Sequence, residues 1–447
     1  MSLCQVTTKY GMLRGVRKIA YVLFRGVPYA KPPLGSLRWK KPEKLMPWEG
    51  VREAKVFANR PVEGESPPGT FYHKEFFTDE DFLPPSSEDC LYLNIWVPAD
   101  FNGVSGDKKY AVAFWIHGGA FISGFSSEME FDGAAFAAQG VILVTVGHRL
   151  GALGYLAHPW LSAEGGGSSG NYGLYDLAAA LDWVRENIAF FGGDPDRITM
   201  FGQSAGAFSV QALVSSKITR GKIHRAIIQS GGGCRMPQGH FNPPVEAEER
   251  GKEFAEQCKA PSLEALRTIP ADKILAAQKI CLNNPPKPGR GNGLPFAPVA
   301  DGVLLEGDAD SLLEQGLHHA IPYMIGCTAD DVDMPPDRTG GENKPPLYDA
   351  ALDFSLLNEK LKNRPSYVYY FTRRPLGDNA GAFHSAELWY IFGTLDRSWR
   401  PKEPKDYELS KLMTRYWCNF IKNGDPNRGD IPQWSPCISA YPFVKVF

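Results

Sequence analysis

Short apolar runs alternate with helical patterns along this chain, and that alternation constrains the fold more than any other feature. Residues 110–116 (YAVAFWI) and 141–146 (VILVTV) are apolar and rich in β-branched or aromatic residues, which is typical of parallel strands buried on both faces. Four further strands are predicted in the same way, at residues 198–201, 226–229, 323–325 and 367–371. Strands that alternate with helices indicate an α/β fold around a mostly parallel sheet.

Two helices are predicted from apolar residues that recur every three or four positions. The recurring residues of the first run from Leu177 to Ile188, and those of the second from Leu409 to Ile421. Gly424 predicts the end of the second helix, because glycine readily takes the left-handed conformation that closes a helix. We expect the apolar stripe of this helix to pack in the core rather than to form a dimer face.

The length of 447 residues alone suggests about three domains. No composition break divides the chain, so we predict instead one large α/β domain over residues 1–447. Cap or loop excursions are expected near residues 60–86, 283–295 and 332–362. The second of these holds the Pro/Gly-rich run NNPPKPGRGNGLP.

Charge and composition exclude several classes of protein. With 48 Lys and Arg against 50 Asp and Glu, the chain has no basic excess with which to bind nucleic acid. No apolar run approaches the roughly 18 residues that span a bilayer, and the N-terminus does not resemble a signal peptide. The eight scattered cysteines lack zinc spacing, so we expect free thiols, a reducing cytoplasmic compartment and no metal.

Two G-x-S-x-G patterns occur, and their contexts separate them. A nucleophile elbow needs a strand before the serine and a helix after it. Ser204 follows the predicted strand at 198–201 and precedes a helical run, whereas Ser168 lies in a Gly/Ser loop. Ser204 is therefore the candidate nucleophile. The helix that begins after it, with its helical run at 207–213, would direct free N–H groups at a developing oxyanion, and the N–H of Ala205 is a candidate donor.

A second group of oxyanion donors is expected in the loop HGGAF, which directly follows the strand at 110–116. Gly118 and Gly119 lack side chains, so their backbone N–H groups can approach an oxyanion closely. A tight turn after a strand would explain the two glycines equally well on their own. The elbow at Ser204 makes the oxyanion hole the better interpretation.

Several motifs in the same order resemble the type-B carboxylesterases, which are cholinesterase-like α/β-hydrolases. These motifs are GVPYAKPP at 26–33, SEDCLYLNI at 87–95, GNYGL at 170–174 and FFGGDP at 190–195. The resemblance runs from about residue 11 to the C-terminus. It implies an α/β-hydrolase fold with a triad in the order Ser, acid, His.

His384 is the base that this resemblance implies, because GAFHSAEL at 381–388 is similar to the catalytic-histidine segment of the family. For the acid, GCTADDV at 326–332 aligns with a family segment and places Asp331 where the family usually has Glu. Asp330 and Asp333 are the competing candidates. Glu387, three residues after His384, is expected to give structural support rather than to bind a metal.

The sequence also departs from the family pattern. Gln203 stands before the serine where many members have Glu, and only 53 residues separate Asp331 from His384 where relatives carry a longer helical segment. The shorter segment predicts a reduced cap and a more open site. Secreted relatives place a cysteine upstream that pairs with the one at Cys90; here the corresponding stretch reads NRPV, so we expect no such bridge.

Together these features predict a serine esterase that acts through an acyl-enzyme on small to medium, apolar or aromatic esters, without a cofactor, as a monomer or homodimer. Candidate pocket residues, each of which could equally belong to the core, are Phe121, Trp389, Tyr390, Phe392 and Trp399. The alternatives are a non-catalytic cholinesterase-like binding protein and a specialised feruloyl-type or detoxifying esterase. A lipase with an apolar lid is disfavoured, because the predicted excursions at 283–295 and 335–346 are polar.

Overall fold

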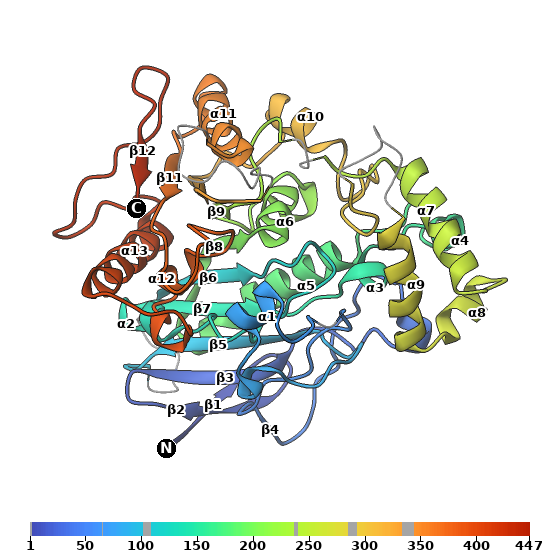
Figure 1. Cartoon of the computed structure of the whole chain (residues 1–447). Helices are drawn as coiled ribbons and strands as arrows, with labels where there is room; N and C mark the ends of the chain where they lie inside the picture. Colours follow the sequence, from blue (N-terminus) through green and yellow to red (C-terminus); the bar gives the residue numbers. More distant parts are fainter. Residues whose placement is uncertain (1, 65, 102–108, 237–239, 285–292, 333–343) are drawn as a thin grey trace.

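A twelve-stranded sheet runs through the molecule (Figure 1). The computed structural model describes residues 2–64, 66–101, 109–236, 240–284, 293–332 and 344–447. The strand order is β1-β2-β3-β5-β7-β6-β8-β9-β10-β11-β12, with β4 paired to β2 outside this path. The strands are β1 (Ser2–Thr7), β2 (Met12–Arg17), β3 (Tyr21–Pro28), β4 (Val51–Glu53), β5 (Tyr92–Pro98), β6 (Tyr110–Ile116), β7 (Val141–Val146), β8 (Gly193–Gln203), β9 (Arg225–Gln229), β10 (Tyr323–Thr328), β11 (Tyr367–Phe371) and β12 (Val444–Val446).

All six strands predicted from the sequence are present, and each is parallel to a neighbour. The antiparallel pairs are confined to the N-terminal part of the sheet, from β1 to the β5–β7 pair. The strands β1, β2, β3 and β5 were not predicted. Exposed or polar residues interrupt β1, β2 and β3, and Asn94 interrupts the apolar run of β5, which is otherwise buried. The mostly parallel sheet confirms the predicted α/β class.

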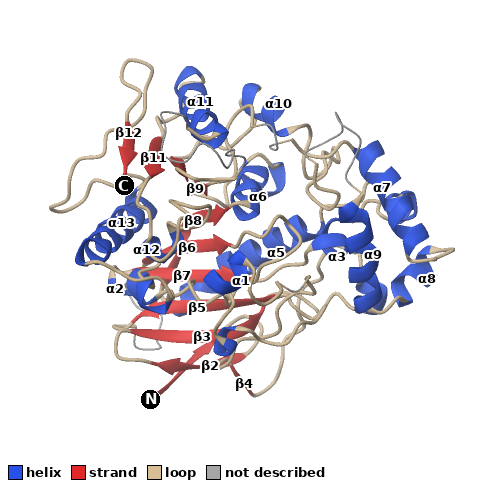
Figure 2. Cartoon of the chain, viewed as in Figure 1, coloured by secondary structure: helices blue, strands red, loops and turns tan. Residues whose placement is uncertain are grey.

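Helices cover both faces of the sheet (Figure 2). The α-helices are α1 (Phe71–Phe76), α2 (Ala134–Ala138), α3 (Gly151–Tyr155), α4 (Pro159–Glu164), α5 (Tyr172–Asn187), α6 (Ala205–Val214), α7 (Pro244–Gln257), α8 (Leu263–Thr268), α9 (Ala271–Asn283), α10 (Ala309–Glu314), α11 (Pro346–Lys360), α12 (Leu388–Ile391) and α13 (Pro404–Asn423). Both predicted helices are confirmed as α5 and α13, and Gly424 ends α13 with a φ of 71°.

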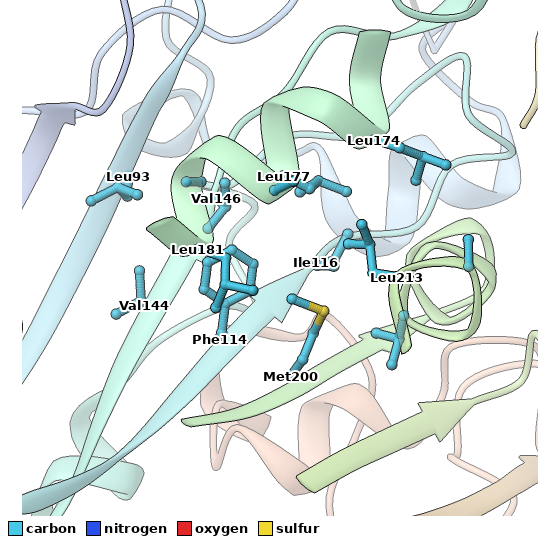
Figure 3. Packing of buried hydrophobic residues seen from close by; sticks show 14 of the residues in the cluster. Leu93, Phe114, Ile116, Val144, Val146, Leu174, Leu177, Leu181, Met200 and Leu213 are labelled. Atoms are coloured by element: carbon cyan, nitrogen blue, oxygen red, sulfur yellow. The ribbon is translucent and has the colours of Figure 1, made fainter. Parts of the chain in front are cut away.

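Two apolar layers fill the space between sheet and helices, because successive strand residues point to opposite faces. On one face, Leu177 and Leu181 of α5 pack over Phe114 and Met200 of the central strands (Figure 3). On the other face, α13 contributes Met413, Tyr416, Trp417, Phe420 and Ile421, all fully buried. The apolar stripe of α13 therefore packs in the core, as predicted.

The expected excursions contain regular structure where they are described. Helix α1 lies within 60–86, and α11 lies within 332–362 and packs against β10 and β11. Residues 285–292 and 333–343, which include most of the two Pro/Gly-rich runs, lie outside the described residues. No helix in the described part of the chain is long and apolar enough to cross a membrane.

Candidate active site

Ser204 lies at the sharp turn between β8 and α6. Its φ of 56° and ψ of −126° belong to a region that L residues rarely adopt, which is typical of a strained, functional position. A Cβ at Gly206 would lie 2.1 Å from the carbonyl oxygen of Ile116, and one at Gly202 would lie 2.6 Å from the backbone of Gly206. Both glycines are therefore required by close backbone approach, as predicted for an elbow. Ser168, by contrast, lies in a loop after α4.

The edge of the sheet where the parallel strands end brings the candidate acid and base together. Asp331 follows the end of β10, and His384 follows β11 and precedes α12. Nδ1 of His384 donates a hydrogen bond to Oδ1 of Asp331, and both side chains are buried. The backbone N–H groups of Thr328 and Val332 donate to the same carboxylate at 3.0 and 2.8 Å.

The charge of Asp331 is favoured by these contacts. Burial alone would raise the pKa of its carboxyl, but the His384 imidazole and the hydrogen bonds that it accepts lower the pKa overall. Asp331 is therefore an anion at neutral pH, and it can hold His384 as the tautomer with the proton on Nδ1.

The competing acids occupy other positions. Asp330 accepts a hydrogen bond from the backbone N–H of Ala382 at 2.7 Å and lies 3.5 Å from Arg374. Its N–H in turn donates to the carbonyl of Ala382. Asp330 thus fixes the loop that carries His384 rather than contacting the imidazole. Asp333 lies outside the described residues.

The loop after β6 lies directly against the nucleophile. A Cβ at Gly118 would lie 3.1 Å from Cβ of Ser204, and one at Gly119, whose φ is 109°, would lie 2.0 Å from the carbonyl of Ser123. Within the described part of the chain, no protein acceptor takes a hydrogen bond from the backbone N–H of Gly118, Gly119 or Ala205. These three donors are available to an oxyanion.

His117 is a residue of this loop that the sequence analysis missed. Its buried ring donates from Nδ1 to the carbonyl of Gly118 at 2.8 Å, and that carbonyl shares a peptide plane with the N–H of Gly119. Burial lowers the pKa of His117 to about 4, so the ring is neutral. Its position directly after β6, next to the two glycines, was the available signal.

Gln203 contacts the base from the other side. Its side-chain nitrogen lies 3.1 Å from Nε2 of His384, and the side chain is buried. Glu387 is also buried, and the amide of Gln229 donates to it at 3.5 Å. Burial, followed by the charge of Asp331, raises the pKa of Glu387 to about 7. No cluster of metal ligands occurs among the described residues, and Glu387 has a supporting position behind the triad.

The candidate pocket residues divide into two groups. Phe121 is the last residue of the loop HGGAF. Its ring centroid lies 5.2 Å from that of Tyr155, in an edge-to-face arrangement. Trp389 stacks on Phe76 of α1 at 5.5 Å, so its ring faces the helix that lies in front of the sheet in Figure 1. Both residues are buried. Phe121 belongs to the loop HGGAF, and Trp389 lies five residues after His384 in the chain.

The other candidates pack away from those loops. The hydroxyl of Tyr390 donates to Asp406 of α13 at 2.8 Å, and the ring of Phe392 lies 5.0 Å from Trp115 within the core. These two side chains have the core role that the sequence analysis kept as the alternative. Trp399 donates to Glu75 at 2.7 Å at the edge of α1.

Tyr72 of α1 is a second residue without a sequence signal, because α1 is a short helix in a region expected to be irregular. Tyr72 as a whole is 41% exposed, but partial burial of its phenol and then the charge of Asp331 raise its pKa to about 12. Phe71 beside it meets Phe383 at 5.0 Å, next to His384. Helix α1 therefore forms an aromatic wall beside the site.

A mostly parallel sheet, helices on both faces and a serine elbow define an α/β-hydrolase. The sequence profile of the Carboxylesterase family matches residues 2–351 and 350–445, and the chain belongs to this family. Para-nitrobenzyl esterase of Bacillus subtilis (strain 168) is 32% identical over 468 residues, which cover 94% of this chain and 90% of that protein. Carboxylesterase 4A of Bos taurus is 32% identical over 504 residues, covering 96% and 88%.

The fold comparison agrees with the sequence comparison. A solved structure of a PNB esterase matches with a TM-score of 0.85 and 28% identity, covering 100% of this chain and 96% of that one. The predicted α/β-hydrolase fold and carboxylic-ester hydrolase activity are thus confirmed, and the non-catalytic alternative is not favoured. All eight cysteines are free, including Cys90, so the bridge expected to be missing is absent.

Proposed function

We propose that this carboxylic-ester hydrolase acts through an acyl-enzyme on Ser204, with His384 as base and Asp331 as the acid that orients it. His384 takes the hydroxyl proton from Ser204 as the oxygen attacks the ester carbonyl. The imidazolium then protonates the leaving alcohol. The same imidazole afterwards activates the water that releases the acid product and restores the serine.

The oxyanion of each tetrahedral intermediate is held by the N–H groups of Gly118, Gly119 and Ala205, because these donors flank Ser204 and none has an acceptor among the described residues. His117 keeps the Gly118–Gly119 peptide oriented. The observation that carries the proposal is the buried contact between Asp331 and Nδ1 of His384. It supplies the hydrogen-bonded pair that a serine nucleophile needs.

Small to medium apolar or aromatic esters are the proposed substrates. Phe121 beside the oxyanion loop and the aromatic side chains of α1, Phe71 and Tyr72, offer apolar surface near the reacting serine. We further propose that the protein is cytoplasmic, since its eight free cysteines suit a reducing compartment, and that it is a monomer or homodimer. Cell fractionation and light scattering test these two points.

The test of the reaction compares two serines that share the G-x-S-x-G pattern. Ser204→Ala is expected to lower the rate of p-nitrophenyl butyrate hydrolysis by several orders of magnitude, because the nucleophile is lost. The matched control Ser168→Ala, in the loop, is expected to keep the wild-type rate. Hydrolysis at the wild-type rate by a correctly folded Ser204→Ala protein would overturn the proposal.

A further inference from the structure

A cavity of about 670 Å³ lies far from the serine, where strands β9 and β10 begin. Its lining includes Arg225, the first residue of β9, and Pro322, which directly precedes β10. Strands β8, β9 and β10 are parallel, so their starts lie at the opposite edge of the sheet from Ser204 and Asp331. The length of β9 separates the two edges by roughly 13 Å. We call this hollow the basal cavity.

The lining of the basal cavity carries an excess of positive charge. Three arginines, Arg220, Arg225 and Arg364, line it together with a single carboxylate, Asp196. Asp196 lies 3.5 Å from Arg185. Within the described part of the chain, no carboxylate lies within ion-pair distance of the three arginines. The cavity therefore holds cationic groups that lack counter-ions among the residues that the structure describes.

Arg225 is the least satisfied of these groups. Its Nε and Nη1 atoms are buried, and no described residue offers either of them a hydrogen-bond partner. Burial, and then the charges of Arg197 and Arg364, lower the pKa of its guanidinium. A buried, charged N–H group without an acceptor is strongly unfavourable, and such groups in folded proteins normally have a partner.

An oxyanion supplies the missing partner. Phosphate and carboxylate groups accept two parallel hydrogen bonds from the planar guanidinium fork, in the geometry that Arg225 and Arg364 can offer. His224 adds a further donor, because its Nδ1 accepts from the N–H of Ile198 at 3.2 Å and the neutral ring then carries its proton on Nε2. The volume of the basal cavity falls within the ~300–1,000 Å³ range of small-molecule sites.

We propose that the basal cavity binds a small anion that carries a phosphate or carboxylate group, held chiefly by Arg225 and Arg364. The site is separate from the ester-hydrolysing centre, since it lies at the other edge of the sheet and shares no residue with it. The proposal therefore stands independently of the roles assigned to Ser204, Asp331 and His384.

Calorimetric titration of the intact protein with inorganic phosphate, and separately with succinate, tests the proposal at constant ionic strength set with sodium chloride. We expect saturable binding of at least one of the two anions, with one site per chain. Arg364→Gln, an exposed position whose change should not disturb folding, is expected to weaken that binding at least tenfold. The matched control Arg52→Gln, exposed on β4 at the other end of the sheet, is expected to bind like the wild type.

Arg225→Gln gives a second readout, because it removes a buried charge that lacks a partner. Without added anion its melting temperature is expected to equal or exceed that of the wild type, and the anion-dependent rise in melting temperature is expected to disappear. Three results would overturn the proposal. The first is no saturable binding of either anion, and the second is equal affinity in the wild type, Arg364→Gln and Arg52→Gln. The third is competition of phosphate with ester substrate, with the same phosphate affinity in the wild type and in Arg364→Gln. That result would place the anion at the edge of the sheet that carries Ser204.

Discussion

The side-chain nitrogen of Gln203 lies 3.1 Å from Nε2 of His384, on the opposite side of the ring from Asp331. The Gln203 amide can donate to the lone pair of a neutral imidazole, but it repels the N–H of an imidazolium. Asp331 has the opposite effect and favours the charged ring. Both neighbours therefore influence the pH at which His384 becomes a usable base.

Replacing Gln203 with the glutamate common in the family should shift that balance. In Gln203→Glu a second buried carboxylate would stabilise the imidazolium, so the pKa of His384 is expected to rise by about one unit or more. The acidic limb of the plot of kcat/KM against pH should therefore move to higher pH, because the imidazole base becomes protonated at a higher pH. A pH profile of p-nitrophenyl acetate hydrolysis measures this.

Gln315→Glu is the control, since Gln315 is exposed on the surface after α10. It makes the same chemical change away from the site and should leave the profile unchanged. An acidic limb that stays in place, or moves to lower pH, in Gln203→Glu would contradict the role given to this side chain.

The assignment of the acid is tested by two neighbouring aspartates. Asp331→Asn should lower kcat by about 10³–10⁴-fold, because an amide cannot stabilise the imidazolium and favours the wrong tautomer. Asp330→Asn keeps an oxygen that can accept from the N–H of Ala382 and should cost less than about tenfold. Single-turnover rates of the two variants compare them directly; a larger loss in Asp330→Asn would reverse the assignment.

The parts of this site that the sequence predicted are those fixed by backbone geometry. Gly202 and Gly206 can be recognised in the sequence because no other residue fits their close contacts. Gly118 and Gly119 follow a strand that its continuous apolar run locates. His384 and Asp331 came from the resemblance to a family and not from spacing. Their side chains meet only because β10 and β11 are adjacent parallel strands.

The parts that the sequence missed depend on long-range packing. His117 looks like any strand-end residue until its ring is seen against the carbonyl of Gly118. Phe392 and Trp389 occupy one short segment, yet Phe392 packs on Trp115 in the core while Trp389 faces α1. No local pattern separates two aromatic residues three positions apart that lie in the same apolar cluster, since tertiary contacts decide which rings each one meets.

Glu387 makes the stability of the fold depend on pH. Its folded-state pKa of about 7 lies above the ordinary value of 4.5, so the protonated form is favoured in the folded protein. The contribution of Glu387 to the free energy of unfolding is therefore fully present below about pH 4.5 and is lost as the pH rises through 7. The glutamine in Glu387→Gln cannot titrate. The free energy of unfolding of this variant should therefore fall less between these pH limits than that of the wild type, by at most about 3 kcal/mol.

Urea denaturation at pH 5, 6, 7 and 8 measures this effect. The free energy of unfolding of Glu387→Gln, relative to wild type, should increase from pH 5 to pH 7 and level off towards pH 8. Glu314→Gln, an exposed carboxylate at the end of α10, is the control and should show no such trend. A constant difference between Glu387→Gln and wild type at all four pH values would contradict the titration.

The central claim is that Ser204 forms the covalent intermediate, and labelling with an organophosphonate ester tests it most directly. Attack by an activated serine should attach one phosphonyl group per chain, and peptide mapping by mass spectrometry should locate it on Ser204. Ser204→Ala should take up no label, while Ser168→Ala should be labelled at the wild-type rate. A label on any other residue, or undiminished labelling of Ser204→Ala, would contradict this account.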